Sequence, residues 1–332
     1  MQVPLILLFV WGTIAAFCPV SSNDLWLLLR EAADIVASGE IPQVEQYSAV
    51  AAGRPYLAHE WLSGLIFLGI FKLGGGEALT VLRAASMLAM LLLLWYSLEK
   101  KERSFVLAAP LLALAAYTIL IRVFVRPHIF THLFLCVWVF ALAHWRRERW
   151  LGYLIMLVPL QVLWANLHGG YIFALVLGAL MTGTAAVLVW RPGWSKDEGY
   201  TRSDVKTLAA LTVACLAASL INPNGLGLLE FSLNIGLASD YIKQVVFEWA
   251  SPLGPKYVRS YGREAALGMF FLMWLGLALN VKRRPFLDAM LALLATLMAV
   301  QAIRFISFIG ILGFPLAVRA WRAIADTQTN SL

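Results

Sequence analysis

Repeated apolar runs, each roughly 17 to 20 residues long, are the feature that most constrains how this chain folds. Short charged clusters separate these runs. A helix of about 20 apolar residues crosses a membrane core and satisfies its own backbone hydrogen bonds. The runs do not alternate between apolar and polar residues, so they do not fit an outer-membrane β-barrel. They predict an all-α polytopic membrane protein, and a composition of 61% hydrophobic and 14% charged residues agrees.

We expect about ten transmembrane helices in a single integral-membrane domain that covers residues 1–332. The spans are predicted near residues 3–20, 78–97, 105–122, 127–143, 150–166, 171–190, 207–222, 265–280, 286–303 and 305–320. The first run has the length of a signal peptide, but it lacks a basic start and a small-residue cleavage site. We therefore interpret it as a retained span.

The net charge of +7 is concentrated in loops on one side of the predicted spans. Of the 26 lysines and arginines, 15 lie in the segments 99–104, 144–149, 191–206 and 281–284 and in the tail from Arg319. Basic loops of membrane proteins face the cytoplasm. This pattern predicts a membrane protein with both termini in the cytoplasm. It also accounts for the positive charge without a nucleic-acid partner.

Residues 61–72 are apolar but too short for a span, because about eleven residues extend only roughly 16 Å as a helix. If this segment crossed the membrane, the later basic loops would face outward. We therefore expect it to be an interfacial or re-entrant helix on the outer face. It belongs to a first large outer loop, residues 21–77, and a second large outer loop is expected at 223–264.

The first outer loop begins with an amphipathic helix. Asn23 or Asp24 is placed to cap its first turn, and Ser38-Gly39 ends it. Its apolar positions share one face and predict a helix lying along the membrane surface; they are Leu25, Leu28, Leu29, Ala32, Ile35 and Val36.

Polar side chains return repeatedly to the same outer side. They include Arg54, His59 and Glu60 in the first loop and Arg126 and His128 at a span start. Later in the chain come Asn166, His168, Glu248 and Arg304. Taken singly, each has a simpler structural interpretation, such as a helix cap, a tight turn or a snorkelling anchor. Together they predict a pocket that offers a carboxylate as base and cations for an anionic headgroup. Composition alone does not distinguish a lipid-linked substrate from an ion or a transported solute.

Several motifs at these residues resemble the GT-C superfamily of integral-membrane glycosyltransferases, and in particular a bacterial mannosyltransferase-like branch. The matches occur in order over about residues 20–310. They are Asp24-Leu25-Trp26, Gly53-Arg54-Pro55, His59-Glu60-Trp61-Leu62, Arg126-Pro127, Trp164-Ala165-Asn166-Leu167-His168-Gly169-Gly170, Asn222-Pro223-Asn224-Gly225 and Glu248-Trp249-Ala250-Ser251-Pro252.

The resemblance implies many membrane helices with amphipathic juxtamembrane helices in the first outer loop. It implies a multi-pass protein of the bacterial inner membrane. It also implies transfer of a sugar from a polyprenyl-phosphate donor to an acceptor at the outer, periplasmic face. Asp24 is then the first catalytic candidate, as general base or as ligand of a divalent cation such as Mg or Mn. His59 and Glu60 would orient the acceptor or the base. The donor phosphate and substrate would be bound by Arg54, Arg126, His128, Asn166, His168, Glu248 and Arg304.

The chain departs from this pattern at two places. Leu27, Leu28 and Leu29 follow Trp26 where the branch is more polar and carries a histidine, and Glu45-Gln46 replaces another polar motif. An alternative is therefore a GT-C-like membrane subunit without catalysis that scaffolds a complex with other membrane proteins. A transporter is a third possibility, but the sequence shows no inverted repeat or paired broken helices. The chain also carries no glycine-rich nucleotide-binding signature, which favours a lipid-linked donor.

Overall fold

The computed structural model describes residues 23–195, 199–236, 246–254, 263–281 and 285–329, together with Ile6 and Val10. The predicted first span, residues 3–20, therefore lies outside the described residues except for these two positions. Among the described residues the structure is helical and contains no β-strand, which confirms the predicted all-α class.

The longer helices in chain order are α2 (Asn23–Ser38), α3 (Trp61–Ser97), α4 (Ala108–Leu120), α5 (His128–Glu148), α7 (Leu157–Leu167), α8 (Ile172–Trp190), α9 (Arg202–Ser219), α10 (Leu226–Gly236), α12 (Arg263–Leu279), α13 (Phe286–Gln301) and α14 (Ser307–Thr329). The short elements are α6 (Gly152–Ile155) and the 3₁₀ turns η1 (Gly169–Tyr171), η2 (Pro192–Trp194), η3 (Phe247–Trp249) and η6 (Ile303–Phe305).

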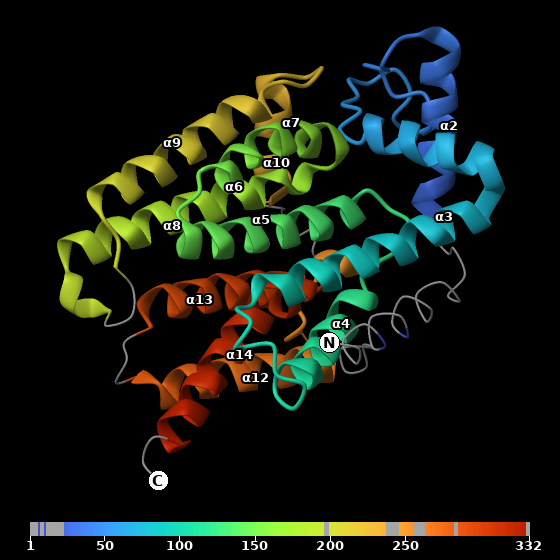
Figure 1. Cartoon of the computed structure of the whole chain (residues 1–332). Helices are drawn as coiled ribbons and strands as arrows, with labels where there is room; N and C mark the ends of the chain where they lie inside the picture. The colour runs from blue at the N-terminus through green and yellow to red at the C-terminus, as the bar shows by residue number, and fades with distance from the viewer. Residues whose placement is uncertain are drawn as a thin grey trace.

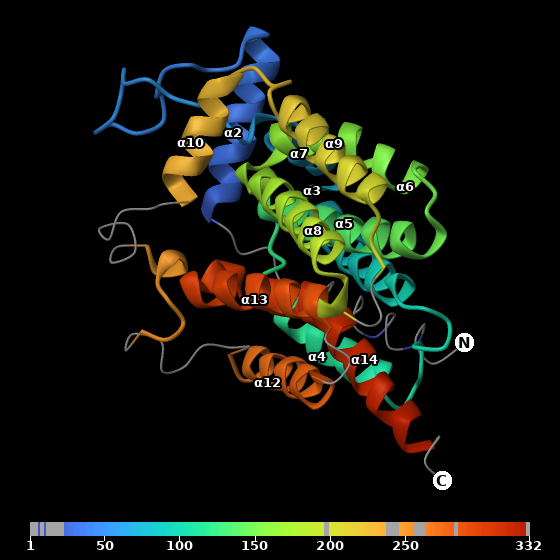
Figure 2. The same ribbon diagram turned by 90° about the vertical axis from the view of Figure 1, so that its left-hand side faces the viewer.

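The helices form two packed groups. One group contains α3, α5, α7, α8 and α9, and the other contains α4, α12, α13 and α14 (Figures 1 and 2). Large aromatic side chains fill the interior, among them the fully buried Trp138, Trp145, Trp164 and Phe314. This packing leaves a seam between α8 and α13, where the two groups meet.

In the part of the chain that the structure describes, four helical segments are long and apolar enough to cross a membrane by length and composition. They are Trp61–Ser97, His128–Glu148, Gly169–Trp190 and Ile303–Thr327. Other predicted spans form shorter apolar helices; the span expected at 105–122, for example, is helical only over Ala108–Leu120. The predicted count of about ten spans is therefore not confirmed.

Helix α3 contains a sharp break at Gly74 and Gly75. Gly75 has a φ of +61° and a ψ of −148°, a combination that only glycine adopts readily. The ribbon changes direction there, so residues 61–73 and 76–97 run as two separate helical segments (Figure 1). The sequence Gly74-Gly75-Gly76 thus ends the short apolar helix expected after Glu60.

The apolar face of α2 packs on the first segment of α3. Leu25, Leu28 and Ala32 are buried, and a Cβ on Gly64 would lie 3.0 Å from the carbonyl oxygen of Leu28. The expectation that this face rests on the membrane surface is therefore wrong for most of its length, because the face is already covered by protein. Val36, predicted on the same face, is exposed.

Candidate functional site

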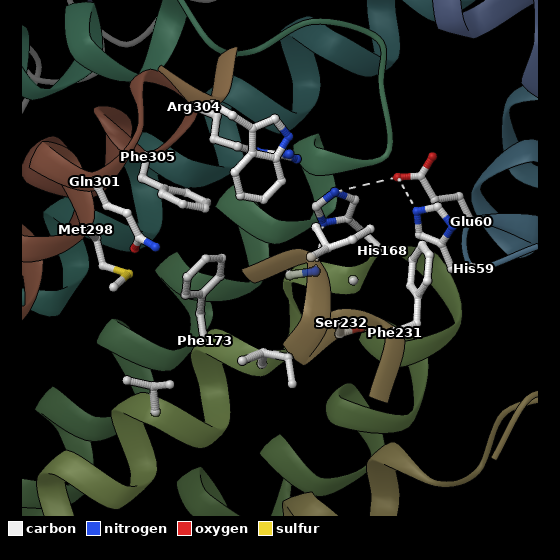
Figure 3. Close-up of a pocket in the computed structure, with 16 residues that line it drawn as sticks. His59, Glu60, His168, Phe173, Phe231, Ser232, Met298, Gln301, Arg304 and Phe305 are labelled. Atoms are coloured by element: carbon white, nitrogen blue, oxygen red, sulfur yellow. Dashed lines mark hydrogen bonds and ion pairs between the residues drawn. The ribbon is translucent and has the colours of Figure 1, made fainter. Parts of the chain in front are cut away.

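A cavity of about 330 Å³ lies where the start of α3 meets η1, α10 and η6 (Figure 3). Its polar wall contains His59, Glu60, His168, Ser232, Gln301 and Arg304. Its apolar wall is formed mainly by Ile172, Phe173, Val176, Phe231, Ile235, Trp249, Met298 and Phe305. A pocket with one charged end and one apolar end suits an amphiphilic ligand.

Two hydrogen bonds bring Glu60 to His168, which is 108 positions later in the chain. Trp61 Nε1 donates to Asn166 Oδ1 at 3.2 Å, and Ser63 Oγ donates to the Leu167 carbonyl at 2.6 Å. These bonds tie the first turn of α3 to the C-terminal end of α7. His168 follows α7 directly and therefore faces the residue that precedes α3.

Glu60 lies at the N-cap of α3, but its side chain makes no capping hydrogen bond. The simple interpretation of this glutamate as a helix cap is therefore not supported. Its Oε1 lies 3.6 Å from His59 Nε2 and 3.6 Å from His168 Nε2 (Figure 3). Burial raises the pKa of Glu60, and the positive charge available at His59 and Arg304 opposes that shift only in part.

The hydrogen bonds of His168 fix its tautomer. The backbone N–H of Gly170 donates to His168 Nδ1 at 3.0 Å, so this nitrogen is an acceptor. The Thr131 hydroxyl lies 2.7 Å from the same nitrogen, and Trp164 Nε1 donates to that hydroxyl oxygen at 2.9 Å. The proton of the neutral imidazole is therefore on Nε2, which faces Glu60. Burial, followed by the nearby Arg304, lowers the pKa of His168 well below its usual range and keeps the ring neutral.

Arg304 supplies the cation of the cavity. It lies in η6 between α13 and α14, and its guanidinium sits over the ring of Trp249, 4.4 Å from the centroid. The backbone N–H of Ile303 donates to the Ala250 carbonyl at 3.0 Å, which fixes η6 against η3. Stacking on the indole face orients the guanidinium at the cavity wall (Figure 3).

Asp24 belongs to a neighbouring network of charges and does not line this cavity. Its Oδ2 lies 3.3 Å from Arg126 Nε, and Arg126 Nη1 donates to Glu248 Oε1 at 2.8 Å. Arg122 Nη2 lies 3.3 Å from the other oxygen of Glu248. Burial alone would raise the pKa of Glu248, but Arg122, Arg126 and Arg304 together lower it. Glu248 is therefore a paired, ionised carboxylate, and its network joins α2, the start of α5 and η3.

The remaining predicted site residues lie outside the cavity wall. His128 Nε2 donates to the Arg122 carbonyl at 2.6 Å, and the His128 ring packs against the His168 ring. Asn166 donates to the carbonyls of Val162 and Ile221. Both side chains therefore support the site. Arg54 is exposed on the loop between α2 and α3.

Two important side chains were missed from the sequence. Arg122 was placed at the end of the predicted span 105–122, although a charge at the edge of an apolar run is costly and therefore informative. Thr131 gave no signal, because a threonine in an apolar helix is common. Its role depends on His168 and Trp164, which come from a different part of the chain.

The described residues contain no group of three or more histidine, cysteine, aspartate or glutamate side chains arranged to hold a metal ion. Asp24, the residue predicted as a metal ligand, has Arg126 beside its carboxylate. A divalent cation would need several oxygen ligands at this position. Among the described residues, the donor set around Asp24 therefore does not fit such an ion.

Comparison with known proteins supports the fold but leaves the family open. No family model and no curated protein matches this sequence. A solved structure does match. The archaeal oligosaccharyltransferase AglB from Archaeoglobus fulgidus, in complex with an inhibitory peptide and a dolichol-phosphate, is similar with a TM-score of 0.59.

The similarity to AglB extends over 98% of this chain and 50% of that chain, at 16% sequence identity. The chain thus spans about half the length of AglB. At this identity the match shows a shared fold and no more. It does not support the bacterial mannosyltransferase-like branch in particular.

Proposed function

We propose that this chain is a GT-C-like glycosyltransferase whose reaction takes place in the cavity beside Glu60. The observation that supports this most is the placement of one carboxylate, Glu60, and one guanidinium, Arg304, in a cavity whose opposite wall is apolar. The donor would be a sugar linked to a polyprenyl phosphate, and the acceptor would approach at the outer membrane face. The dolichol-phosphate in the AglB structure agrees with a lipid-linked donor.

Glu60 is the proposed general base. A carboxylate takes the proton of an acceptor hydroxyl most effectively when its pKa is raised toward the working pH. Burial raises the pKa of Glu60 in this direction. The Nε2–H of neutral His168 faces one carboxylate oxygen at 3.6 Å and would orient the carboxylate by electrostatic attraction. The base would then direct its free lone pairs toward the acceptor.

Arg304 would bind the donor phosphate. As the acceptor oxygen bonds to the anomeric carbon, the bond from that carbon to the phosphate oxygen breaks, and its electrons leave with the phosphate. A guanidinium donates two parallel hydrogen bonds to a phosphate and stabilises this growing charge. The first isoprene units of the carrier would contact the apolar wall, including Phe173 and Met298.

A transfer assay in lipid nanodiscs tests this proposal. The full chain would be supplied with a panel of radiolabelled polyprenyl-phosphate hexoses and a membrane-extract acceptor, and release of polyprenyl phosphate would be measured. We expect release with wild type and with Glu40→Gln, an exposed charge-matched control in the same loop. Glu60→Gln should lower release by about 100-fold or more. Equal release by Glu60→Gln and Glu40→Gln would refute the assignment of the base.

A catalytically inactive membrane subunit is the second candidate. Two observations favour it. Leu28 and Leu29, at positions where the GT-C pattern is more polar, are buried in a helix that packs on α3. Asp24 is paired with Arg126. In that case the chain would purify stably with partner membrane proteins and would neither bind nor cleave a polyprenyl-phosphate sugar. Photo-crosslinking with a labelled polyprenyl phosphate separates the two, because only the transferase predicts crosslinks to the cavity wall.

A further inference from the structure

Helix α2 buries a carboxylate, Glu31, at its interface with the start of α3. Only 3% of Glu31 is exposed. Its helix neighbours Leu28 and Ala32 lie against Gly64 of α3, because a Cβ on Gly64 would be 3.0 Å from the Leu28 carbonyl oxygen and 3.4 Å from the Ala32 Cβ. A carboxylate is costly to bury unless it is hydrogen-bonded, so the partners of Glu31 are informative.

Tyr56, in the loop between α2 and α3, is the hydrogen-bond partner of Glu31. The Tyr56 hydroxyl donates to Glu31 Oε2 at 3.0 Å. The other oxygen, Oε1, is buried and has no hydrogen-bond partner among the described residues. The backbone N–H of Tyr56 donates to the Gln43 carbonyl at 2.8 Å. Tyr56 is therefore anchored through both its backbone and its side chain.

Glu60 lies between two points at which its chain segment contacts α2. The first is the hydrogen bond from Tyr56 to Glu31, four positions before Glu60. The second is Gly64, whose backbone N–H donates to the Glu60 carbonyl at 3.0 Å and which packs on Leu28. The position of the Glu60 carboxylate therefore depends on both contacts with α2.

The charges that act on Glu31 come mainly from the segment that carries Glu60. Burial raises the pKa of Glu31. The Tyr56 hydrogen bond and the charge of His59 oppose this shift, whereas Glu60 and Glu45 increase it. Because the interaction between two charges is mutual, an ionised Glu31 disfavours the ionised form of Glu60.

A second tyrosine of the same loop makes the same kind of bond at a different place. The Tyr47 hydroxyl donates to Asp34 Oδ2 at 3.2 Å, further along α2. Asp34 is partly exposed, and the same oxygen lies 3.0 Å from Arg30 Nε. Tyr47 and Asp34 therefore form a matched control for the buried bond between Tyr56 and Glu31.

We propose that Glu31 is a positioning residue of the Glu60 cavity, which acts through Tyr56 to hold Glu60 opposite His168 and which places a negative charge behind it. This inference rests on the proposed function, because it takes Glu60 as the base. Glu31 itself does not line the cavity, so it would act on the reaction only through other residues.

Transfer rates in nanodiscs test the positional part of the proposal. Tyr56→Phe removes the bond to Glu31, so Glu60 loses one of its two contacts with α2, and kcat should fall about tenfold or more. Tyr47→Phe removes the matched bond to Asp34 and should change kcat less than about twofold. Equal kcat in the two variants would overturn the proposal.

An infrared titration tests the charge of Glu31 without any transfer of sugar. The carboxyl stretch of Glu60, assigned by its loss in Glu60→Gln, would report the pH at which Glu60 gains its proton. Glu31→Gln keeps an oxygen for the Tyr56 hydroxyl but removes the charge, so Glu60 should titrate at lower pH than in wild type. Asp34→Asn should leave this titration unchanged. An unchanged titration in Glu31→Gln, or an equal movement in Asp34→Asn, would overturn the proposal.

The infrared titration also separates this inference from the proposed function. If wild type releases no polyprenyl phosphate but Glu31→Gln moves the titration of Glu60, the proposed function is wrong and the action of Glu31 on Glu60 stands. If wild type releases polyprenyl phosphate and the variants at Glu31 and Tyr56 behave as their controls do, only this inference is wrong. A merely structural role would lower the melting temperature of Tyr56→Phe and leave kcat per folded protein unchanged. If Tyr56→Phe fails to fold, Glu31→Gln, which keeps the hydrogen bond, still tests the proposal.

Discussion

Glu60 and Asp24 belong to one group of charged side chains, but their surroundings differ. Glu60 lies in a cavity between two imidazoles, and burial raises its pKa. Asp24 is mostly exposed and lies beside Arg126, whose other partner is Glu248. A base needs an unpaired carboxylate near the substrate, whereas a paired and exposed carboxylate holds elements together.

Arg304 and Arg126 differ in the same way. Arg304 stacks on Trp249 and faces the cavity, and it forms no ion pair with a carboxylate of the described residues. Arg126 already contacts two carboxylates. We infer that the residues lining the Glu60 cavity carry the proposed reaction. Asp24, Arg126 and Glu248 instead fix the first loop to η3.

Replacing the two acids should give the largest difference. Glu60→Gln removes the proposed base and should lower the transfer rate by about 10²- to 10⁴-fold, the usual contribution of a general base. Asp24→Asn breaks an exposed ion pair and should cost less than about tenfold. Rates of polyprenyl-phosphate release in nanodiscs would measure both. The reverse order of effects would return Asp24 to the role that the family resemblance implies.

The two arginines should differ less strongly. Arg304→Gln removes the group proposed to stabilise the leaving phosphate, so we expect kcat to fall by about 10²-fold or more. Arg126→Gln should act mainly through the position of Glu248 and should change kcat less. Arg30→Gln, which alters only an exposed ion pair with Asp34, is the control. A greater loss of kcat in Arg126→Gln than in Arg304→Gln would contradict the division of roles.

The contrast between Glu60 and Asp24 was not predictable from local sequence. Asp24 was predicted as the catalytic acid from the family resemblance, and His59 and Glu60 were predicted to orient the acceptor or the base. The distinction depends on which of them meets His168 and Arg304, and these residues come from other helices. The motif around His168 predicted a tight turn at the correct place, but it gave no information about which acid would face that turn.

The fold was predicted better than the number of spans. Helix α5 starts directly after Pro127 as expected, and glycines break α3 close to the predicted end of the short helix. Apolar length alone does not determine whether a helix spans a membrane or lies within a bundle. Helix α4 illustrates this, because its apolar run extends beyond the 13 residues that are helical, and most of its side chains are buried by other helices.

The hydrogen bonds around His168 Nδ1 sharpen the comparison further, because the described residues form no such hydrogen-bond chain around Asp24. Thr131→Val removes the hydroxyl that lies between Trp164 Nε1 and His168 Nδ1. The buried indole N–H then lacks a partner, so the free energy of unfolding should fall by about 1 to 3 kcal/mol. Thr131→Ser keeps the hydroxyl and should lose less.

The ¹⁵N shifts of His168 would show whether Thr131 also sets the tautomer. Wild type should carry its proton on Nε2, and Thr131→Val should increase the fraction protonated on Nδ1. His168→Gln would assign the signal. A purely structural role for Thr131 would lower stability and leave these shifts unchanged.

The smallest expected effect concerns pH. Glu60 accepts a proton only when it is ionised, so activity should fall as the pH drops through its pKa. Burial raises that pKa, and His59 is the strongest of the neighbours that oppose the shift. His59→Gln removes this opposition, so the acid limb of the rate profile should move to higher pH while the rate at alkaline pH changes little. His144 lies near the C-terminal end of α5 and does not line the Glu60 cavity, so His144→Gln should leave the acid limb at the wild-type pH. If the acid limb moves to lower pH in His59→Gln, a group other than Glu60 controls it. An acid limb that persists in the residual activity of Glu60→Gln would lead to the same conclusion.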